Sequence, residues 1–188
     1  KVIHSALMNK KNIKTYSAKW AVDQSHSHIG FEVKHMMVSK VKGVFDSYTA
    51  NVEAADLADL TGANISFKFD VASINTRNED RDNHLKSADF FDAEQFPAIT
   101  FESTAITKLG DRFDVTGNLT IKGVTKEVTF KTEFNGKGTN PWGQAVYGFE
   151  ADTKINREDF DLTWNAALET GGVLVGKEVK IKVELELN

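Results

Sequence analysis

The densest group of side chains that could do chemistry is Arg81, Asp82 and His84. An imidazole beside a carboxylate can move protons, and a guanidinium can hold an anion. Catalysis would also need a nucleophile or a paired base, and none stands nearby in the sequence. Two other interpretations remain. The three residues tie a loop down through charge-assisted hydrogen bonds, or they contact the polar end of a ligand.

A zinc site in this chain would need ligands other than Cys, because the chain has 5 His and no Cys. His26 and His28 are two residues apart, and such side chains on one face of a strand can bind a metal ion. Their parity is opposite to that of Ile29 and Phe31, so they should point outward, and no third ligand is obvious. We therefore expect no metal site and no cofactor. His35 has the inward parity, which suits a hydrogen-bonded interior residue.

A repeat of two residues dominates the chain and predicts antiparallel strands with one dry and one wet face. The alternating segments are 16–22, 27–35, 41–53, 63–71, 99–103, 113–121, 128–134, 147–155 and 179–187. Two segments break the repeat. Residues 77–92 have mixed helical character, and residues 156–176 contain Arg157, Trp164 and the pair Gly171-Gly172. Long structured loops on a β scaffold often carry function or cover an opening.

The predicted strands all have one apolar face, so they must cover a common interior. The inward positions hold many of the 13 Phe and few charges. Large rings can fill the core of a β-sandwich, or they can line the hollow of a barrel of about eight strands. Periodicity does not separate these cases, because a filled core and a lined cavity give the same alternation.

The composition predicts one globular domain: 188 residues, 40% hydrophobic and 27% charged. The net charge of -4 argues against a nucleic-acid partner and against a polybasic grip on anionic lipid. The absence of Cys excludes disulfides, thiol catalysis and a Cys-based zinc site. No transmembrane segment is expected, because no run approaches the ~18 apolar residues that a span needs. Transient membrane contact stays open.

Residues 1–15 are expected to be an N-terminal extension of a single domain over residues 16–188. Met8, followed by Asn9-Lys10-Lys11, looks like a natural start, which would make residues 1–7 a remnant of cloning. The first 14 residues lack the continuous apolar stretch of a secretory signal, so a cytoplasmic location is expected. A signal removed upstream would instead indicate a periplasmic or secreted protein.

A series of motifs runs in order along the chain. It comprises HS at 26–27 with Ile29, Phe31, Val33 and His35-Met36, SKVKG at 39–43 with Phe45, SINT at 73–76, RDNHL at 81–85, DFFD at 89–92, FPAITF at 96–101, GNLTIKGV at 117–124 and INR at 155–157. Together with the late strand through Val179 and Ile181, these motifs resemble the YceI-like, polyisoprenoid-binding proteins. The resemblance covers about residues 16–187.

The resemblance implies a lipocalin-like, extended eight-stranded antiparallel β-barrel with a short helical or loop excursion around residues 77–92. It also implies a bound isoprenoid-type or other long-chain lipid, and it is compatible with a homodimer. The residues expected to contact the lipid are Ile29, Phe31, Val33, His35, Met36, Phe45, Phe67, Phe69, Leu85, Phe90, Phe91, Phe101, Leu119, Phe149 and Trp164. The expected polar mouth consists of Arg81, Asp82, His84 and Arg157.

The expected function is to hold a polyprenyl compound, an isoprenoid quinone or a fatty amide for storage, transport or a stress response. Two alternatives stay open. The protein is an enzyme that acts on a lipid through the loop with Arg81, Asp82 and His84, or it is a structural stress protein with an empty lumen. The missing nucleophile favours a binding protein without catalytic residues.

Overall fold

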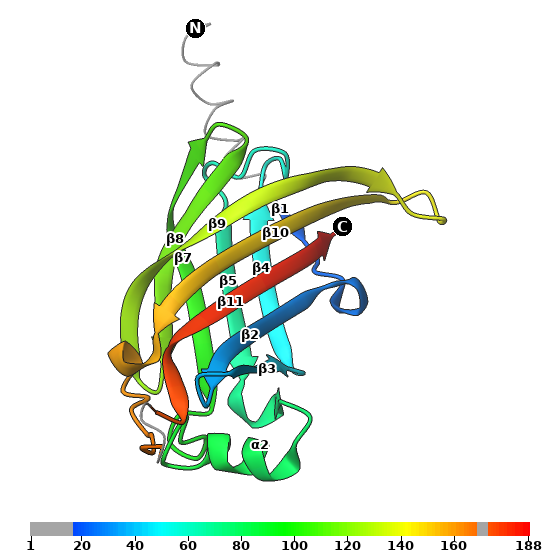
Figure 1. The fold of residues 1–188 in the computed structure, drawn as a ribbon. Helices are drawn as coiled ribbons and strands as arrows, with labels where there is room; N and C mark the ends of the chain where they lie inside the picture. Colours follow the sequence, from blue (N-terminus) through cyan, green and yellow to red (C-terminus); the bar gives the residue numbers. More distant parts are fainter. Residues whose placement is uncertain (1–16, 169–172) are drawn as a thin grey trace, which may run out of the picture.

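A computed structural model describes residues 17–168 and 173–188. It confirms the all-β antiparallel fold, and the described part contains one α-helix (Figure 1). That helix lies within residues 77–92, where mixed helical character was predicted. The expected extension over residues 1–15, Tyr16 and the pair Gly171-Gly172 lie outside the described residues.

The elements follow one another along the chain with mostly short connections. They are β1 (Ala18–Trp20), the 3-10 helix η1 (Gln24–His26), β2 (His28–His35), β3 (Ser39–Phe45), β4 (Tyr48–Ala54), β5 (Asn64–Asp70), the 3-10 helix η2 (Val71–Ser73), β6 (Ile74–Asn75), α2 (Glu79–Lys86), β7 (Ala98–Leu109), β8 (Arg112–Ile121), β9 (Val124–Thr139), β10 (Ala145–Asn156), the 3-10 helix η3 (Arg157–Phe160) and β11 (Val175–Leu187).

The described strands form one antiparallel sheet in the order β1-β4-β5-β7-β8-β9-β10-β11-β2-β3-β6. The strand count is eleven rather than eight, since β1 and β6 are short strands of 3 and 2 residues. The predicted strand over 41–53 is also two strands, because Asp46 and Ser47 form a bend between β3 and β4. β3 pairs with β2 and β6, whereas β4 pairs with β1 and β5. The described sheet is therefore a curled half-barrel and not a fully paired barrel (Figure 1).

Two short segments tie the curled sheet together at opposite ends. After β1, Ala21 and Asn188 exchange backbone hydrogen bonds of 2.9 and 3.0 Å, and the amide of Asp23 donates to the carbonyl of Glu186 at 2.9 Å. This stretch therefore joins the β1–β4 edge to the end of β11. At the other end, β6 follows β5 in the chain and pairs with β3. β6 pairs with edge groups of β3 that the missing β3–β4 ladder would have used, and β1 does the same for β4.

The interior is packed in one part and hollow in another. Leu57, Phe113 and Phe160 are almost fully buried and are not among the described residues that line the cavity. Phe31 and Phe67 also have inward parity, but they are only half-buried because they border an internal cavity. The open question of a filled core or a lined cavity is thus decided in favour of a cavity.

Candidate functional site

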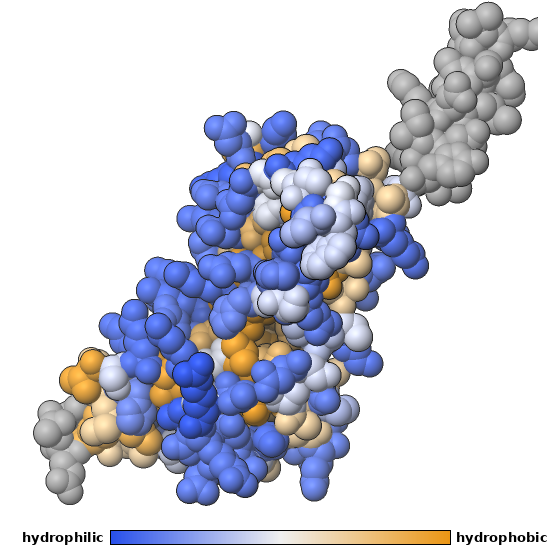
Figure 2. Space-filling view, turned by 90° about the vertical axis from the view of Figure 1, so that its right-hand side faces the viewer, coloured by the Kyte–Doolittle hydropathy of each residue, from blue (hydrophilic) through white to orange (hydrophobic). Residues whose placement is uncertain are grey.

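The curled sheet encloses a cavity of about 340 Å³, within the range of ~300–1,000 Å³ typical of ligand sites. Its walls are mainly Phe, Val, Ile and Leu side chains from β2, β5, β7, β8, β10 and β11. Figure 2 shows a mostly hydrophilic outer surface and, through an opening in this face, the apolar interior. The strand alternation thus separates a wet exterior from a dry lumen.

A chain of aromatic rings crosses the place where β3 and β4 are unpaired. The ring of Phe45 on β3 lies 5.8 Å from that of Phe31, 5.8 Å from that of Phe69 and 6.0 Å from that of Phe91. Phe31 lies over Gly43, where an added Cβ would come within 2.4 Å of its ring. Glycine at this position therefore makes room for the ring, and ring contacts replace backbone pairing across the gap.

Fourteen of the fifteen residues expected to contact a lipid line this one cavity. They are Ile29, Phe31, Val33, His35, Phe45, Phe67, Phe69, Leu85, Phe90, Phe91, Phe101, Leu119, Phe149 and Trp164. Met36 is the exception, and its expected place in the lining is wrong. β2 ends at His35, and Met36 begins a turn with a φ of 52° and 45% exposure. The alternation stops there, so parity no longer predicts direction.

The predicted polar mouth is only partly assembled as expected. Arg81, His84 and Arg157 line the cavity, but Asp82 is not among its described lining residues. Asp82 instead accepts hydrogen bonds from the backbone amide and the hydroxyl of Thr76. Its expected place at the mouth is therefore wrong, because the two bonds turn its carboxylate toward the loop before α2.

Local hydrogen bonds set the position of α2. The side chain of Asn78 caps the helix by accepting from the amide of Arg81 at 3.0 Å. Arg81 then donates from Nε to the hydroxyl of Thr76 at 2.8 Å and from Nη2 to its carbonyl at 2.7 Å. The loop-tying interpretation therefore applies to Arg81 and Asp82. Arg81 Nη1 makes no hydrogen bond to any described residue, so both of its N–H groups stay available.

His84 joins α2 to the segment after η3. Its ring makes edge-on contacts with Trp164 at 4.7 Å and with Phe90 at 5.0 Å, and its Nε2 lies 2.9 Å from Asp89 Oδ2. All three rings line the cavity. They form an aromatic cover at the α2 end of the cavity.

Arg157 is a buried cation, only 3% exposed. Its Nε donates to the carbonyl of Gly176 at 2.7 Å, and its terminal nitrogens donate to the carbonyls of Leu162, Trp164 and Val175. Burial lowers the pKa of the guanidinium, although it stays protonated in practice. Arg157 thus fastens the segment after η3 to the start of β11 and places positive charge beside the cavity.

The polar side chains in the described lining are all basic, apart from one hydroxyl. Lys34, His35, Arg81, His84 and Arg157 share the α2 end, and no described Asp or Glu belongs to the lining. The hydroxyl belongs to Thr132, which donates to the carbonyl of Phe130. The lining therefore offers donors to an electron-rich group, and it shows no hydrogen-bonded nucleophile–base pair.

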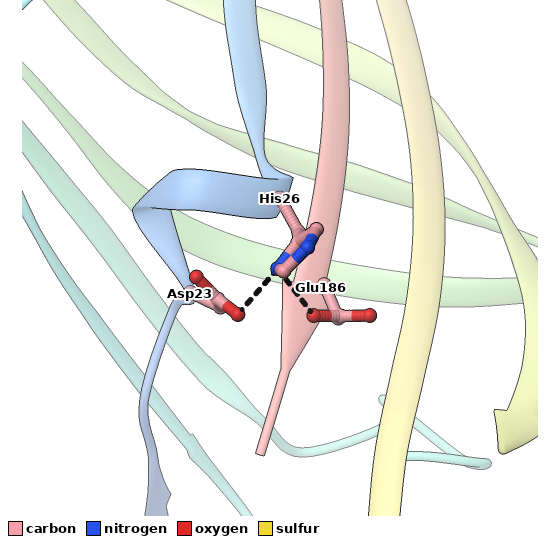
Figure 3. A group of neighbouring side chains, drawn as sticks. All are labelled: Asp23, His26 and Glu186. Atoms are coloured by element: carbon pink, nitrogen blue, oxygen red, sulfur yellow. Dashed lines mark hydrogen bonds and ion pairs between the residues drawn. The ribbon is translucent and has the colours of Figure 1, made fainter. Parts of the chain in front are cut away.

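A second polar cluster was missed by the sequence reasoning (Figure 3). Nδ1 of His26 lies 2.8 Å from Asp23 Oδ2 and 3.4 Å from Glu186 Oε2. The hydrogen bond from Ser25 and that from His26 hold the pKa of Asp23 well below its usual range, and Asp23 raises the pKa of His26. The short spacing between Asp23 and His26 was the available clue to this cluster. Glu186 lies too far along the chain for a spacing rule to connect it with His26.

This cluster lies outside the cavity, on the segment that ties β1 to β11. His28 is exposed, as its parity on β2 predicted; His26 is also exposed, but it lies in η1 and not on a strand. The donor atoms of Asp23, His26 and Glu186 lie within 4.8 Å of one another, so they are the described residues best placed to share a cation. The imidazole of His26 lies between the two carboxylates (Figure 3). None of the helices within the described ranges has the length and apolar character needed to cross a bilayer.

Comparison with known proteins agrees with this architecture. A UPF0312 protein of Staphylococcus aureus (strain N315) is 47% identical over 167 residues, covering 88% of this chain and 95% of that protein. The crystal structure of Burkholderia cenocepacia BcnA shares 29% identity with a TM-score of 0.76, over 88% of this chain and 99% of that one.

A more distant structure shows the same fold alone. It is a domain from Saccharophagus degradans, described as polyisoprenoid-binding and implicated in plant cell wall breakdown, with 13% identity, a TM-score of 0.64, and 90% and 97% of the two chains covered. The model of the YceI-like domain matches residues 20–187, from the end of β1 to the end of β11. This chain belongs to the YceI-like domain family.

Proposed function

We propose that this protein binds one long apolar lipid chain in its cavity, with the polar end of the lipid beside Arg81, His84 and Arg157. One observation carries the proposal: the cavity is apolar along its length and basic at one end. The description of the Saccharophagus degradans domain as polyisoprenoid-binding supports the same class of ligand. A polyprenyl compound, an isoprenoid quinone and a fatty amide all combine a long apolar chain with an oxygen acceptor.

The half-buried rings are the strongest sign of an apolar occupant. Phe31, Phe67 and Phe69 point inward but keep accessible surface. Leaving large apolar side chains around a void forfeits contacts that a packed core would gain. A lipid chain running past these rings would restore the contacts. Moving the chain out of water would also be favourable by about 0.8 kcal/mol for every CH₂ buried.

The relevant competitor for the lipid is a membrane. A chain of tens of carbons gains nearly as much from a bilayer as from the cavity, so the difference between the two is small. The cavity can therefore take up and return its lipid reversibly, as a carrier or store must. Alkyl burial is almost non-directional, so selectivity has to come from the lumen shape and from the polar end.

The polar end favours a head group with exposed oxygens. The available Nη1 of Arg81 and the buried charge of Arg157 both attract electron density, and no described carboxylate in the lining neutralises them. Phosphate, quinone and amide oxygens would all fit these donors. The same lining favours binding over catalysis, because it offers no nucleophile hydrogen-bonded to a base.

The test has two arms. Native mass spectrometry of protein purified from its own host should detect an apolar adduct, and extraction should identify its head group. In the second arm, Arg81→Gln should weaken binding of a prenyl phosphate about tenfold, as expected for one lost charge-assisted bond, and leave binding of squalene, a hydrocarbon, unchanged. The proposal fails if no adduct is found and the purified protein takes up neither probe.

A further inference from the structure

The turn between β2 and β3 exposes three consecutive apolar side chains, which we call the β2–β3 tip. Met36 is 45% exposed, Met37 59% and Val38 86%. The other large apolar residues that are exposed in the described ranges, Leu109 and Trp142, stand alone. A single exposed apolar side chain is ordinary, but a contiguous group on a surface usually meets a partner.

The backbone of the tip is held in place. The amide of Met36 donates to the carbonyl of Leu174 at 2.8 Å, and the amide of Val38 donates to that of His35 at 3.2 Å. Met36 and Met37 have φ values of 52° and 66°, in a region that Gly or Asn would occupy with less strain. An ordinary tight turn would therefore favour other residues. Large apolar side chains at these two positions point to a use for them.

The strands behind the tip present positive charge. Lys34 and Lys40 lie directly opposite each other on β2 and β3, and all three lysines of this hairpin, including Lys42, are exposed. Like charges in that position destabilise a sheet, and an anionic surface would offset the repulsion. Glu32 supplies the nearest negative charge, with its carboxylate 4.0 Å from Lys40 Nζ. The hairpin is thus locally basic although the whole chain carries -4.

The tip lies at the polar end of the cavity. Lys34 and His35, which immediately precede it, line the cavity, and so does Leu174, which accepts its backbone hydrogen bond. Figure 1 places the β2–β3 turn at the same end of the molecule as α2, which supplies Arg81 and His84. Anything bound by the tip would therefore face the end where the proposed head group lies.

We propose that the β2–β3 tip docks the protein on an anionic lipid bilayer, with its three apolar side chains among the head groups and Lys34 and Lys40 against lipid phosphates. Unbranched methionine side chains adapt to an irregular apolar surface, and the lysines add electrostatic attraction. The polar end of the cavity then faces the bilayer, so that a lipid can move between the two with little exposure to water. The lipid-transfer part of this inference rests on the proposed function, whereas the docking part does not.

The experiment measures binding to vesicles by flotation. The vesicles contain phosphatidylcholine alone or phosphatidylcholine mixed with phosphatidylglycerol. The double variant Met37→Asn, Val38→Ser should lose roughly tenfold or more of the affinity, because two apolar anchors leave the bilayer, and Asn tolerates the positive φ. The double variant Lys34→Gln, Lys40→Gln should lose the preference for phosphatidylglycerol and its salt dependence. Trp142 is an exposed aromatic residue in another turn, and the control variant Trp142→Ser should bind vesicles as the wild type does.

Three results would overturn the docking surface. The first is a wild type that does not float with either vesicle. The second is a loss of affinity in Trp142→Ser as large as that in the tip variant. The third is a tip variant that has a smaller oligomeric state by light scattering and unchanged vesicle binding. The last result would assign the tip to contact between copies of this chain. Circular dichroism and unfolding measurements check that each variant is folded.

A radiolabelled polyprenol separates failure of docking from failure of the proposed cargo. Supplied from ethanol, it should bind to wild type and tip variant alike. Supplied from vesicles, it should enter the wild type faster than the tip variant. A wild type that floats but retains no polyprenol would refute the cargo and keep the docking surface. Equal uptake from vesicles by both proteins would refute a role of the tip in transfer.

Discussion

Replacing Phe67 tests whether a ligand runs through the middle of the cavity. Phe67 lies on β5, stacks on Phe69 with ring centroids 6.0 Å apart and planes 7° apart, and faces Phe101 across the strands. It is half-buried and lines the cavity. Phe67→Trp should therefore fill space that a lipid would occupy, and Phe67→Ala should widen the same space.

The magnitudes follow from the hollow beside the ring. In a filled core, Phe→Ala costs about 3–5 kcal/mol and overpacking roughly 1–3 kcal/mol. Phe67 already borders a void, so we expect Phe67→Ala to cost about 1–2 kcal/mol and Phe67→Trp less than about 1 kcal/mol in the ligand-free protein. Phe113→Ala is the matched control. Phe113 is 2% exposed and is not among the described lining residues, so its loss should cost the full amount of about 3–5 kcal/mol.

The assays are urea unfolding of the ligand-free variants and binding of prenyl chains of several lengths. Phe67→Trp should weaken binding of the longest chains about tenfold or more, which corresponds to about 1.4 kcal/mol, and spare short chains. Phe67→Ala should shift the preference toward bulkier chains. If Phe67→Trp costs several kcal/mol without changing binding, the lipid does not pass this residue, and the assignment of β5 to the ligand channel is refuted.

Three further predictions concern the charged groups. Arg157→Met should destabilise the protein by at least about 3 kcal/mol in urea unfolding, because four backbone carbonyls lose their donor. Lys154→Met, at the exposed ion pair with Glu178, should cost no more than about 0.5 kcal/mol. Similar losses in the two variants would contradict the proposed fastening role. Asp23 raises the pKa of His26 in the folded state. The stability that His26 adds should therefore be fully present below about pH 6.5 and disappear as the pH rises through the folded pKa. A His26→Gln variant with the same pH–stability curve as the wild type would refute this. Fold and bound lipid should survive strong chelation, and a stoichiometric metal ion at Asp23, His26 and Glu186 whose removal lowers the melting temperature would show the opposite.

Alternation in the sequence was enough to predict most of the fold. Side chains on a strand point to opposite faces in turn, so the parity of Phe31, Phe67 and Phe149 was sufficient to place them on one inner face. The break in the repeat after residue 77 similarly predicted a helical excursion, where α2 lies. These inferences succeed because they depend only on backbone geometry within one segment.

Inferences that depended on where a segment ends were less secure. Met36 has no inward direction because β2 ends one residue earlier, and the bend at Asp46 and Ser47 divides one predicted strand into β3 and β4. Asp82 shares the polar loop with Arg81, but its carboxylate turns to Thr76. A side chain chooses among nearby donors, and several choices are compatible with the same local sequence.

Tertiary structure alone decided three features of the protein. The sheet curls without pairing β3 to β4, Arg157 finds its four carbonyls in segments up to nineteen residues away, and Glu186 reaches His26 from the other end of the chain. Whether inward Phe side chains fill a core or line a hollow was likewise undecidable from alternation, because the distance between facing strands depends on the curl of the whole sheet. The sequence determined which side of each strand is apolar, and the closure of the sheet determined how much space those sides enclose.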